Sequence, residues 1–469
     1  MKTLAHDRAF LRGQLPPAAV LALLCSCAAE APPDKASERL VPRPPVLDQQ
    51  QEVLETNDAT GQLGTISLAG RVRTDGLFFQ SLGTNGRSCA SCHVASEGWT
   101  ITPAGLRRRF EATRGTDPVF RTNDGSNSPA ADVSTVTARR AAYSMLLNKG
   151  LIRVGMGIPA GADFELVAVD DPYRAATRDE LSLFRRPLPS TNLTFLTAVM
   201  WDGRETFAGQ TIHFDLDHQA SDATIGHAMG PPLTPAQQEE IETFETGLFT
   251  AQTRDDAAGD LTTLGARGGP EALSVVPFTI GINDPLGPPG GFDPVAMSLF
   301  ASWESAPGRG ARAEARAAVA RGQRIFNTKA INIDGVRGLN PDGPPISATC
   351  TTCHNSPDVG NHSVALALDL GLTDASRRTP DLPLYTLRHL SDGALFRTTD
   401  PGRAMVTGKW SDRGRFKGPI LRGLSSRAPY FHNGSAATLE QVLEFYSSRF
   451  GVPFTAGEKS DLVAFLRTL

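Results

Sequence analysis

The chain has 469 residues and a formal net charge of −4 at pH 7. Its length exceeds what one hydrophobic core supports, so two domains are expected, and the mild negative charge argues against nucleic acid as a partner. A low aromatic content (7%) together with 45 glycines and 34 prolines indicates long irregular segments.

The N-terminus has the features of an export signal. Basic residues precede an apolar run at 18–24, which is too short for a permanent membrane anchor. Residues 24–27 (Leu-Cys-Ser-Cys) resemble a bacterial lipoprotein cleavage site, with Cys27 as the lipidated first residue. Cleavage among the alanines that follow is the alternative. We therefore predict a signal peptide at 1–27, a tether at 28–50, and a periplasmic lipoprotein attached to the membrane by lipid.

Helix signals follow in the rest of the chain, separated by irregular segments. Thr102 before Pro103 predicts one helix start, and the capping pattern of Thr438 with Gln441 predicts another. A polar loop is predicted at 116–134, and a Gly/Pro-rich stretch at 265–294 marks a domain boundary. Little of the sequence has strand periodicity, so the fold class is predicted to be mainly α. The predicted helices are 103–110, 235–249, 311–326, 438–446 and 460–469.

The motif Cys-x-x-Cys-His occurs twice, at 89–93 and at 350–354. Two thiols at this spacing can add to the vinyl groups of one haem, and the histidine that follows can bind its iron. Zinc or disulfide roles are the alternative, but no further Cys-x-x-Cys pair completes a four-thiolate site. The sequence therefore predicts two covalently bound haem c groups, held by Cys89, Cys92 and His93 and by Cys350, Cys353 and His354.

Each motif falls in one of the two expected domains. We predict two cytochrome c-like haem domains with long irregular loops, one at 51–280 and one at 281–469.

Three further motifs carry a family resemblance: WDGR at 201–204, FKGPILR at 416–422 and APYFHNGS at 428–435. With the two haem motifs, they resemble the bacterial dihaem cytochrome c peroxidase and MauG family over residues 51–469. The resemblance implies that the N-terminal haem reacts with hydrogen peroxide and that the C-terminal haem relays electrons. A small donor protein such as a cytochrome c or a cupredoxin, or an oxidisable substrate, would supply those electrons.

The resemblance also implies a sixth ligand for the second haem iron, fourteen residues beyond His432. That position is Tyr446. A phenolate ligand favours the ferric state, whereas a thioether favours the ferrous state. Met405 is the alternative ligand, and a purely structural Tyr446 in the core is the other alternative.

At the first haem, the family's peroxidases carry a histidine that plugs the distal face before WDGR. This chain has no histidine between His93 and His213, so an open face is expected. Three methionines remain as alternative plugs: Met145, Met156 and Met200. The resemblance places Trp201 between the haems as an electron relay, although a core tryptophan is the simpler alternative.

Peroxide cleavage needs a proton carrier. The resemblance matches Gln219 and His227 to the family's distal pair, with His213 or His218 as the alternative acid–base. It also implies a structural calcium, for which Asn192 and Pro429 could supply oxygen ligands. Arg427 stands where relatives carry a threonine ligand to that calcium.

Three functions are compatible with these motifs. The first is an oxidoreductase that reduces hydrogen peroxide or uses it to oxidise a substrate. The second is a dihaem electron carrier without peroxidase activity, and the third is a dioxygen-using dihaem oxygenase. The absence of a distal histidine plug favours the enzyme over the carrier.

Overall fold

The computed structural model describes residues 51–279, 281–285, 292–306, 308–362 and 367–469. The predicted signal peptide, with Cys25 and Cys27, and the predicted tether at 28–50 lie outside the described residues. None of the helices in the described part of the chain has the combination of length and apolar content that a bilayer crossing requires.

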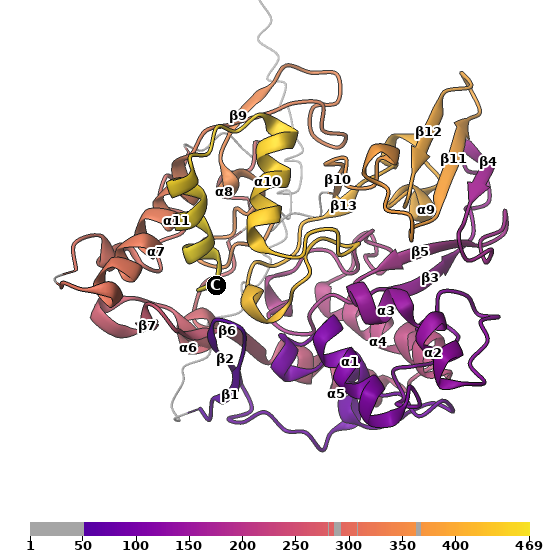
Figure 1. The fold of residues 1–469 in the computed structure, drawn as a ribbon, viewed down its shortest axis with the longest axis horizontal. Helices are drawn as coiled ribbons and strands as arrows, with labels where there is room; N and C mark the ends of the chain where they lie inside the picture. Colours follow the sequence, from indigo (N-terminus) through magenta and orange to yellow (C-terminus); the bar gives the residue numbers. More distant parts are fainter. Residues whose placement is uncertain (1–50, 280, 286–291, 307, 363–366) are drawn as a thin grey trace, which may run out of the picture. The chain divides into compact units, whose positions relative to one another are not determined.

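Eleven α-helices are present among the described residues (Figure 1). Many begin with a threonine N-cap, whose side-chain oxygen accepts a hydrogen bond from an otherwise unpaired amide of the first turn. The helices are α1 (Pro103–Thr113), α2 (Val136–Ala142), α3 (Ser144–Lys149), α4 (Ile212–Ala228), α5 (Pro235–Thr246), α6 (Gly269–Ser274), α7 (Ala311–Thr328), α8 (Cys350–Cys353), α9 (Ala404–Thr407), α10 (Leu439–Phe450) and α11 (Ala456–Leu466).

All five predicted helices exist, with shifted ends. The predicted helix at 235–249 ends at Thr246, and its last residues begin a strand. At the start of α10, Thr438 accepts from the Gln441 amide, but the Gln441 side chain accepts from Ala437 instead of Thr438, so the capping box is only half formed. α11 begins four residues before the predicted start, at a complete capping box of Thr455 and Glu458.

The prediction of a mainly α fold is confirmed only in part, since α- and 3₁₀-helices together hold 33% of the described residues and extended strand or bridge residues 16%. The strands are short and form small sheets, which leave little alternating pattern in the sequence. They are β1 (Leu54–Asn57), β2 (Gly61–Ser67), β3 (Ile152–Met156), β4 (Phe164–Asp170), β5 (Leu181–Arg185), β6 (Leu248–Asp255), β7 (Gly259–Asp260), β8 (Ile331–Ile333), β9 (Ile346–Ala348), β10 (Ala367–Leu368), β11 (Leu384–His389), β12 (Leu395–Thr398) and β13 (Phe416–Lys417).

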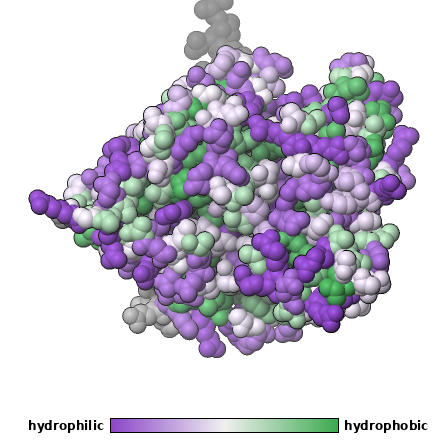
Figure 2. Space-filling model, viewed as in Figure 1, coloured by the Kyte–Doolittle hydropathy of each residue, from purple (hydrophilic) through white to green (hydrophobic). Residues whose placement is uncertain are grey.

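Two of the sheets join segments that are far apart in the sequence. One sheet has the order β1-β2-β6-β7, and the other has the order β12-β11-β4, with all its pairs antiparallel. The pairing of β4 with β11 crosses the predicted boundary at residue 280, and the division into two domains stays a prediction. The β12-β11-β4 sheet lies at the upper right of Figure 1, where Figure 2 shows apolar side chains at the surface. The exposed large apolar residues of this sheet are Val167, Val169 and Leu395.

The largest core cluster lies where α7, α10 and α11 pack together. α7 and α11 approach closely at Gly322, where a Cβ atom would come within 2.0 Å of the Asp461 carbonyl oxygen. Only glycine allows this contact, because any side chain would meet backbone. The close packing fixes the α7–α11 pair beside α8, which carries the second haem motif.

Candidate functional site

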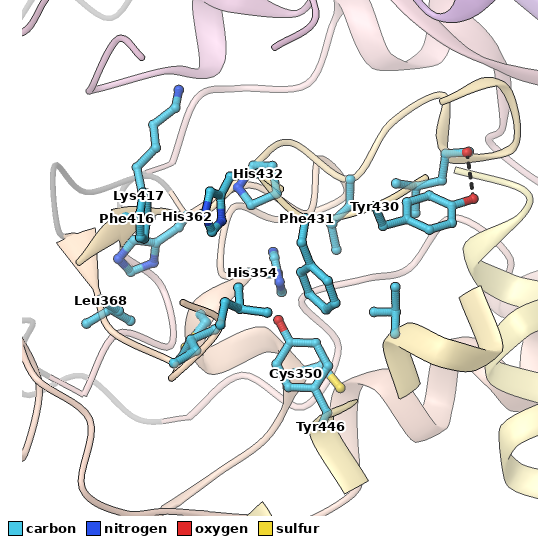
Figure 3. A pocket seen from close by; sticks show the side chains of 18 of the residues that line it. Cys350, His354, His362, Leu368, Phe416, Lys417, Tyr430, Phe431, His432 and Tyr446 are labelled. Carbon is cyan, nitrogen blue, oxygen red and sulfur yellow. Dashed lines mark hydrogen bonds between the residues drawn. The ribbon is translucent and has the colours of Figure 1, made fainter. Parts of the chain in front are cut away.

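The second haem motif lines an apolar cavity of about 230 Å³, here called the C-terminal cavity. The motif forms the single-turn helix α8, whose start is capped reciprocally by Thr349 and Thr352. Cys350, Cys353 and His354 all line the cavity. Figure 3 shows Cys350 and His354 in its wall. A flat apolar cofactor fits such a wall, because the cavity lining is largely aliphatic and aromatic.

His354 is oriented by one backbone contact. Its Nδ1 lies 3.1 Å from the carbonyl oxygen of Gly360. Since a carbonyl only accepts, Nδ1 carries the hydrogen and Nε2 keeps its lone pair for a metal. Burial lowers the pKa of His354 to about 4, so the imidazole is neutral at physiological pH.

Tyr446 comes to the same cavity from α10. Its ring packs near Phe431, Phe445 and Phe450, and its hydroxyl points toward the space faced by His354 (Figure 3). Burial raises the pKa of the Tyr446 phenol, and the nearby cysteines raise it further. Its position fits the predicted role as second ligand, which stays a prediction. Met405, the alternative ligand, packs in another core cluster and is not among the residues that line this cavity.

The first haem motif lines a second cavity, of about 160 Å³, here called the N-terminal cavity. Cys89 begins a short 3₁₀ turn whose first residues are capped by Ser88 and Ser91. The Nδ1 atom of His93 lies 3.0 Å from the Trp99 carbonyl oxygen and 2.9 Å from Ser190 Oγ. The carbonyl again fixes the hydrogen on Nδ1, and burial lowers the pKa of His93 to about 4. Both proximal histidines therefore present a free Nε2 atom, as haem iron requires.

A buried carboxyl group stands behind His93. Glu245 is hydrogen-bonded to Ser190, the same hydroxyl that contacts His93 Nδ1. Burial raises the pKa of Glu245 to about 7. The sequence analysis did not single out this glutamate, because nothing in its local spacing differs from that of a surface helix.

One face of α4 forms a wall of the N-terminal cavity. Gln219 and His227 line the cavity together with the small residues Ala220, Ala223 and Thr224, at the spacing of three and four that places side chains on one side of a helix. The structure therefore brings together the two predicted distal residues.

His227 is held in place by a buried ion pair. Its Nδ1 contacts the carboxylate of Asp124, which also binds Arg87. Burial alone would raise the pKa of Asp124, but Arg87 and His227 outweigh it, and the pKa is lowered. Asp124 is therefore ionised and orients the imidazole. The sequence analysis treated 116–134 only as a loop and missed this carboxylate.

The alternative residues lie elsewhere. His213 pairs with Glu242 and His218 pairs with Glu205, and neither histidine is among the residues that line the N-terminal cavity. Of the three methionines considered as plugs, only Met200 lines this cavity; Met145 and Met156 pack in or against other core clusters.

Trp201 lines both cavities. Its indole Nε1 donates to the Arg186 carbonyl oxygen at 2.7 Å, and its own carbonyl accepts from the Lys417 amide at 2.8 Å. Its ring centroid lies 6.1 Å from that of His432, whose buried Nε2 has no hydrogen-bond partner among the described residues. The neighbouring Asp202 is fixed by Arg185. Trp201 thus has the position that an inter-haem relay requires, and the role stays a prediction.

Of the two predicted calcium ligands, Asn192 already uses its side-chain oxygen in a hydrogen bond within the protein. The amide oxygen of Asn192 accepts from the Thr250 amide at 2.9 Å, and its nitrogen donates to the Thr250 carbonyl at 2.9 Å. Pro429 lines the C-terminal cavity. Calcium at these residues stays a prediction.

Comparisons with known proteins found a cytochrome c-like family model and relatives named cytochrome c peroxidases. A family model described as RoxA-like, cytochrome c-like matches residues 415–451. The cytochrome c551 peroxidase of Nitrosomonas europaea is 34% identical over 143 residues, which make up 30% of this chain and 35% of the relative. A cytochrome c peroxidase of Pseudomonas sp. (strain SCT) is 32% identical over 142 residues, 26% of this chain and 36% of the relative. The chain thus spans about a third of the length of the curated relatives it matches.

Among solved structures, a MauG-like protein associated with microbial copper homeostasis aligns over 84% of this chain and 87% of its own, at 15% identity and a TM-score of 0.35.

The two motifs, their cavities and the cytochrome c-like match over residues 415–451 support covalently bound haem c. Over about a third of their length, the chain is similar to proteins named cytochrome c peroxidases, in line with the resemblance carried by its motifs.

Proposed function

We propose that this protein is a periplasmic dihaem oxidoreductase that reduces hydrogen peroxide at the N-terminal cavity, with electrons relayed from the C-terminal cavity. The observation that carries the proposal is the placement of Gln219 and the Asp124-oriented His227 in the same cavity as the haem motif of Cys89, Cys92 and His93. The names of the curated relatives support it.

The residues of the N-terminal cavity can manage the protons of this reaction. Reduction of one peroxide to two waters consumes two electrons and two protons. Because Nδ1 of His227 donates to Asp124, its Nε2 can take a proton from bound peroxide and return it to the leaving oxygen. The Gln219 amide can orient peroxide by hydrogen bonding. When bound, haem supplies the iron that binds peroxide and passes on the electrons.

The electron path would run through the wall shared by the two cavities. Trp201 is the aromatic side chain that lines both, and its backbone is held by Lys417 and its indole by Arg186. At the other end, His354 and Tyr446 would saturate the iron of the second haem, so that this haem transfers electrons and does not bind peroxide.

The finer parts of the proposal concern location and partners. Export and lipidation at Cys27 would place the protein in the periplasm, tethered to the membrane. The electron donor would be a small cytochrome c or cupredoxin, unless an oxidisable substrate takes its place. A calcium ion near Asn192 and Pro429 would stabilise the site.

The test combines spectroscopy with turnover. Purified protein should contain two haems per chain, with a high-spin ferric signal in the resting state, and should reduce peroxide with an electron donor. His93→Ala should abolish turnover and the high-spin signal while leaving the second haem low-spin. Two low-spin haems that do not react with peroxide would instead indicate an electron carrier. Turnover that requires dioxygen would indicate an oxygenase.

A further inference from the structure

Three basic side chains lie in the region between the two haem cavities, and they are here called the cation group: Arg186, Lys417 and Arg427. Arg186 and Lys417 line both cavities, and Arg427 lines the C-terminal cavity. Arg186 is only 5% exposed and Arg427 only 8%. Lys417 is half-buried, and in Figure 3 its side chain extends away from His354 and Tyr446.

Within the described residues, no carboxylate forms an ion pair with the cation group, although the charge of Glu97 acts on Arg186 from a greater distance. Arg186 donates to the carbonyl oxygens of Lys149, Ile101 and Arg427, each at 2.9 Å. Lys417 Nζ donates to the Ala198 carbonyl at 2.8 Å, and Arg427 donates to the Ile420 carbonyl at 2.6 Å. Carbonyls satisfy hydrogen bonds but do not neutralise charge.

The neighbouring Arg185 shows how this protein compensates a buried cation. Its guanidinium binds the carboxylates of both Asp202 and Asp400. A buried charge is costly unless it is paired, and the cation group lacks such pairing. Burial correspondingly lowers the pKa of Lys417 to about 7, and that of Arg186 to about 9.

Local packing keeps these cations in place. Arg427 lies against Gly98, where a Cβ atom would come 2.6 Å from Arg427 Cγ. The Nε atom of Arg427 is buried and has no hydrogen-bond partner among the described residues. One donor of the group therefore remains available inside the protein.

We propose that the cation group binds the propionate carboxylates of the haems held in the two cavities. The propionates would then supply the negative charges that no ion-paired side chain supplies there. Haem is the source of these anions, because the motif cysteines that would hold it line the same cavities as the cations. The inference rests on the proposed haem binding but is independent of peroxide chemistry.

The test uses the mature dihaem protein, with haem content measured first so that failed haem loading is recognised separately. Resonance Raman spectra report the propionate bending bands, and spectroelectrochemistry reports both midpoint potentials. In Lys417→Met we expect a shifted propionate band. We also expect a lower midpoint potential at one haem or both, because a nearby positive charge is lost. The equilibrium constant for reduction should fall by tenfold or more, which corresponds to 59 mV for one electron. Lys417→Arg retains the charge and should keep both readouts close to the wild-type values.

Lys149→Met is the matched control. Lys149 pairs with Asp381 and lines neither cavity, so its loss should leave the propionate bands unchanged. Arg427→Gln gives a second variant if Lys417→Met does not fold, and the same band shift is expected. Unchanged propionate bands in these charge-removing variants would overturn the proposal, whatever happens to the potentials.

Discussion

Tyr446 is the predicted sixth ligand of the second haem iron. A phenolate stabilises the ferric state, whereas a thioether raises the potential. Tyr446→Met should therefore raise the midpoint potential of one haem, by part of the roughly 0.8 V range that axial ligands span. Spectroelectrochemical titration measures this. Tyr430→Phe is the control, because Tyr430 lines the same cavity but its hydroxyl is occupied by the Leu424 carbonyl. An unchanged potential in Tyr446→Met would exclude this residue as a ligand.

Glu245 makes stability depend on pH. Its ordinary pKa of 4.5 is raised to about 7 in the folded protein by burial. Between these values the unfolded chain has released the proton while the folded chain keeps it, so stability falls as pH rises from about 4.5 to 7 and then levels off. The loss is on the order of 3 kcal/mol.

Glu245→Gln has no ionisable group at this position, so its unfolding free energy should change less between pH 5 and pH 8. Denaturant unfolding at the two pH values measures the difference. Equal pH dependence in the two proteins would show that Glu245 ionises normally in the fold.

At the residue scale, the sequence identifies residues whose chemistry requires a fixed spacing. It does not identify residues that are important only because the fold buries them. The haem-binding cysteines and histidines follow from their motif, and Gln219 with His227 follows from the resemblance. Asp124 and Glu245 carry no such spacing. Their significance comes from desolvation and from partners distant in the chain, which a single sequence does not display.

At the scale of elements, one ion-pair network joins three segments. Arg185 at the end of β5 binds Asp202 after Trp201 and Asp400 after β12. In Asp202→Ala, Arg185 keeps Asp400 but loses the acceptor of one buried guanidinium donor, so the variant should be destabilised by about 1–3 kcal/mol. It should also slow electron transfer between the haems, because Trp201 loses its neighbouring anchor.

Denaturant unfolding and flash-reduction kinetics measure these two effects. The control is Asp75→Ala, which removes an exposed pair with Arg73 and should leave both unchanged. Equal stability of Asp202→Ala and the wild type would mean that the network does not hold the segments together.

The sequence did not predict α4, whose inner face lines a cavity large enough for part of a cofactor. α4 turns mostly small residues toward the N-terminal cavity, with Leu216 as its large aliphatic side chain there, so the apolar stripe that reveals an amphipathic helix is weak. The strands were missed for a different reason. β4 pairs with β11 across more than two hundred residues, and within the described residues it has no partner strand beside it in the sequence.

At the scale of the whole molecule, the two cavities are gaps in the apolar core that bound haem would fill. A residual cavity costs about 24 cal/mol per Å³ when nothing fills it. Without haem, the C-terminal cavity of about 230 Å³ would then cost ~5 kcal/mol. The N-terminal cavity of about 160 Å³ would cost ~4 kcal/mol.

Serine substitution of Cys350 and Cys353 together should therefore yield a one-haem protein with lower unfolding free energy than the wild type. The same change at Cys89 and Cys92 should give a smaller loss, because the cavity that it leaves is smaller. Haem content and denaturant unfolding of both double variants measure the order. Stability equal to that of the wild type in either one-haem protein would mean that the surrounding chain collapses into the cavity, and that haem does not complete the core.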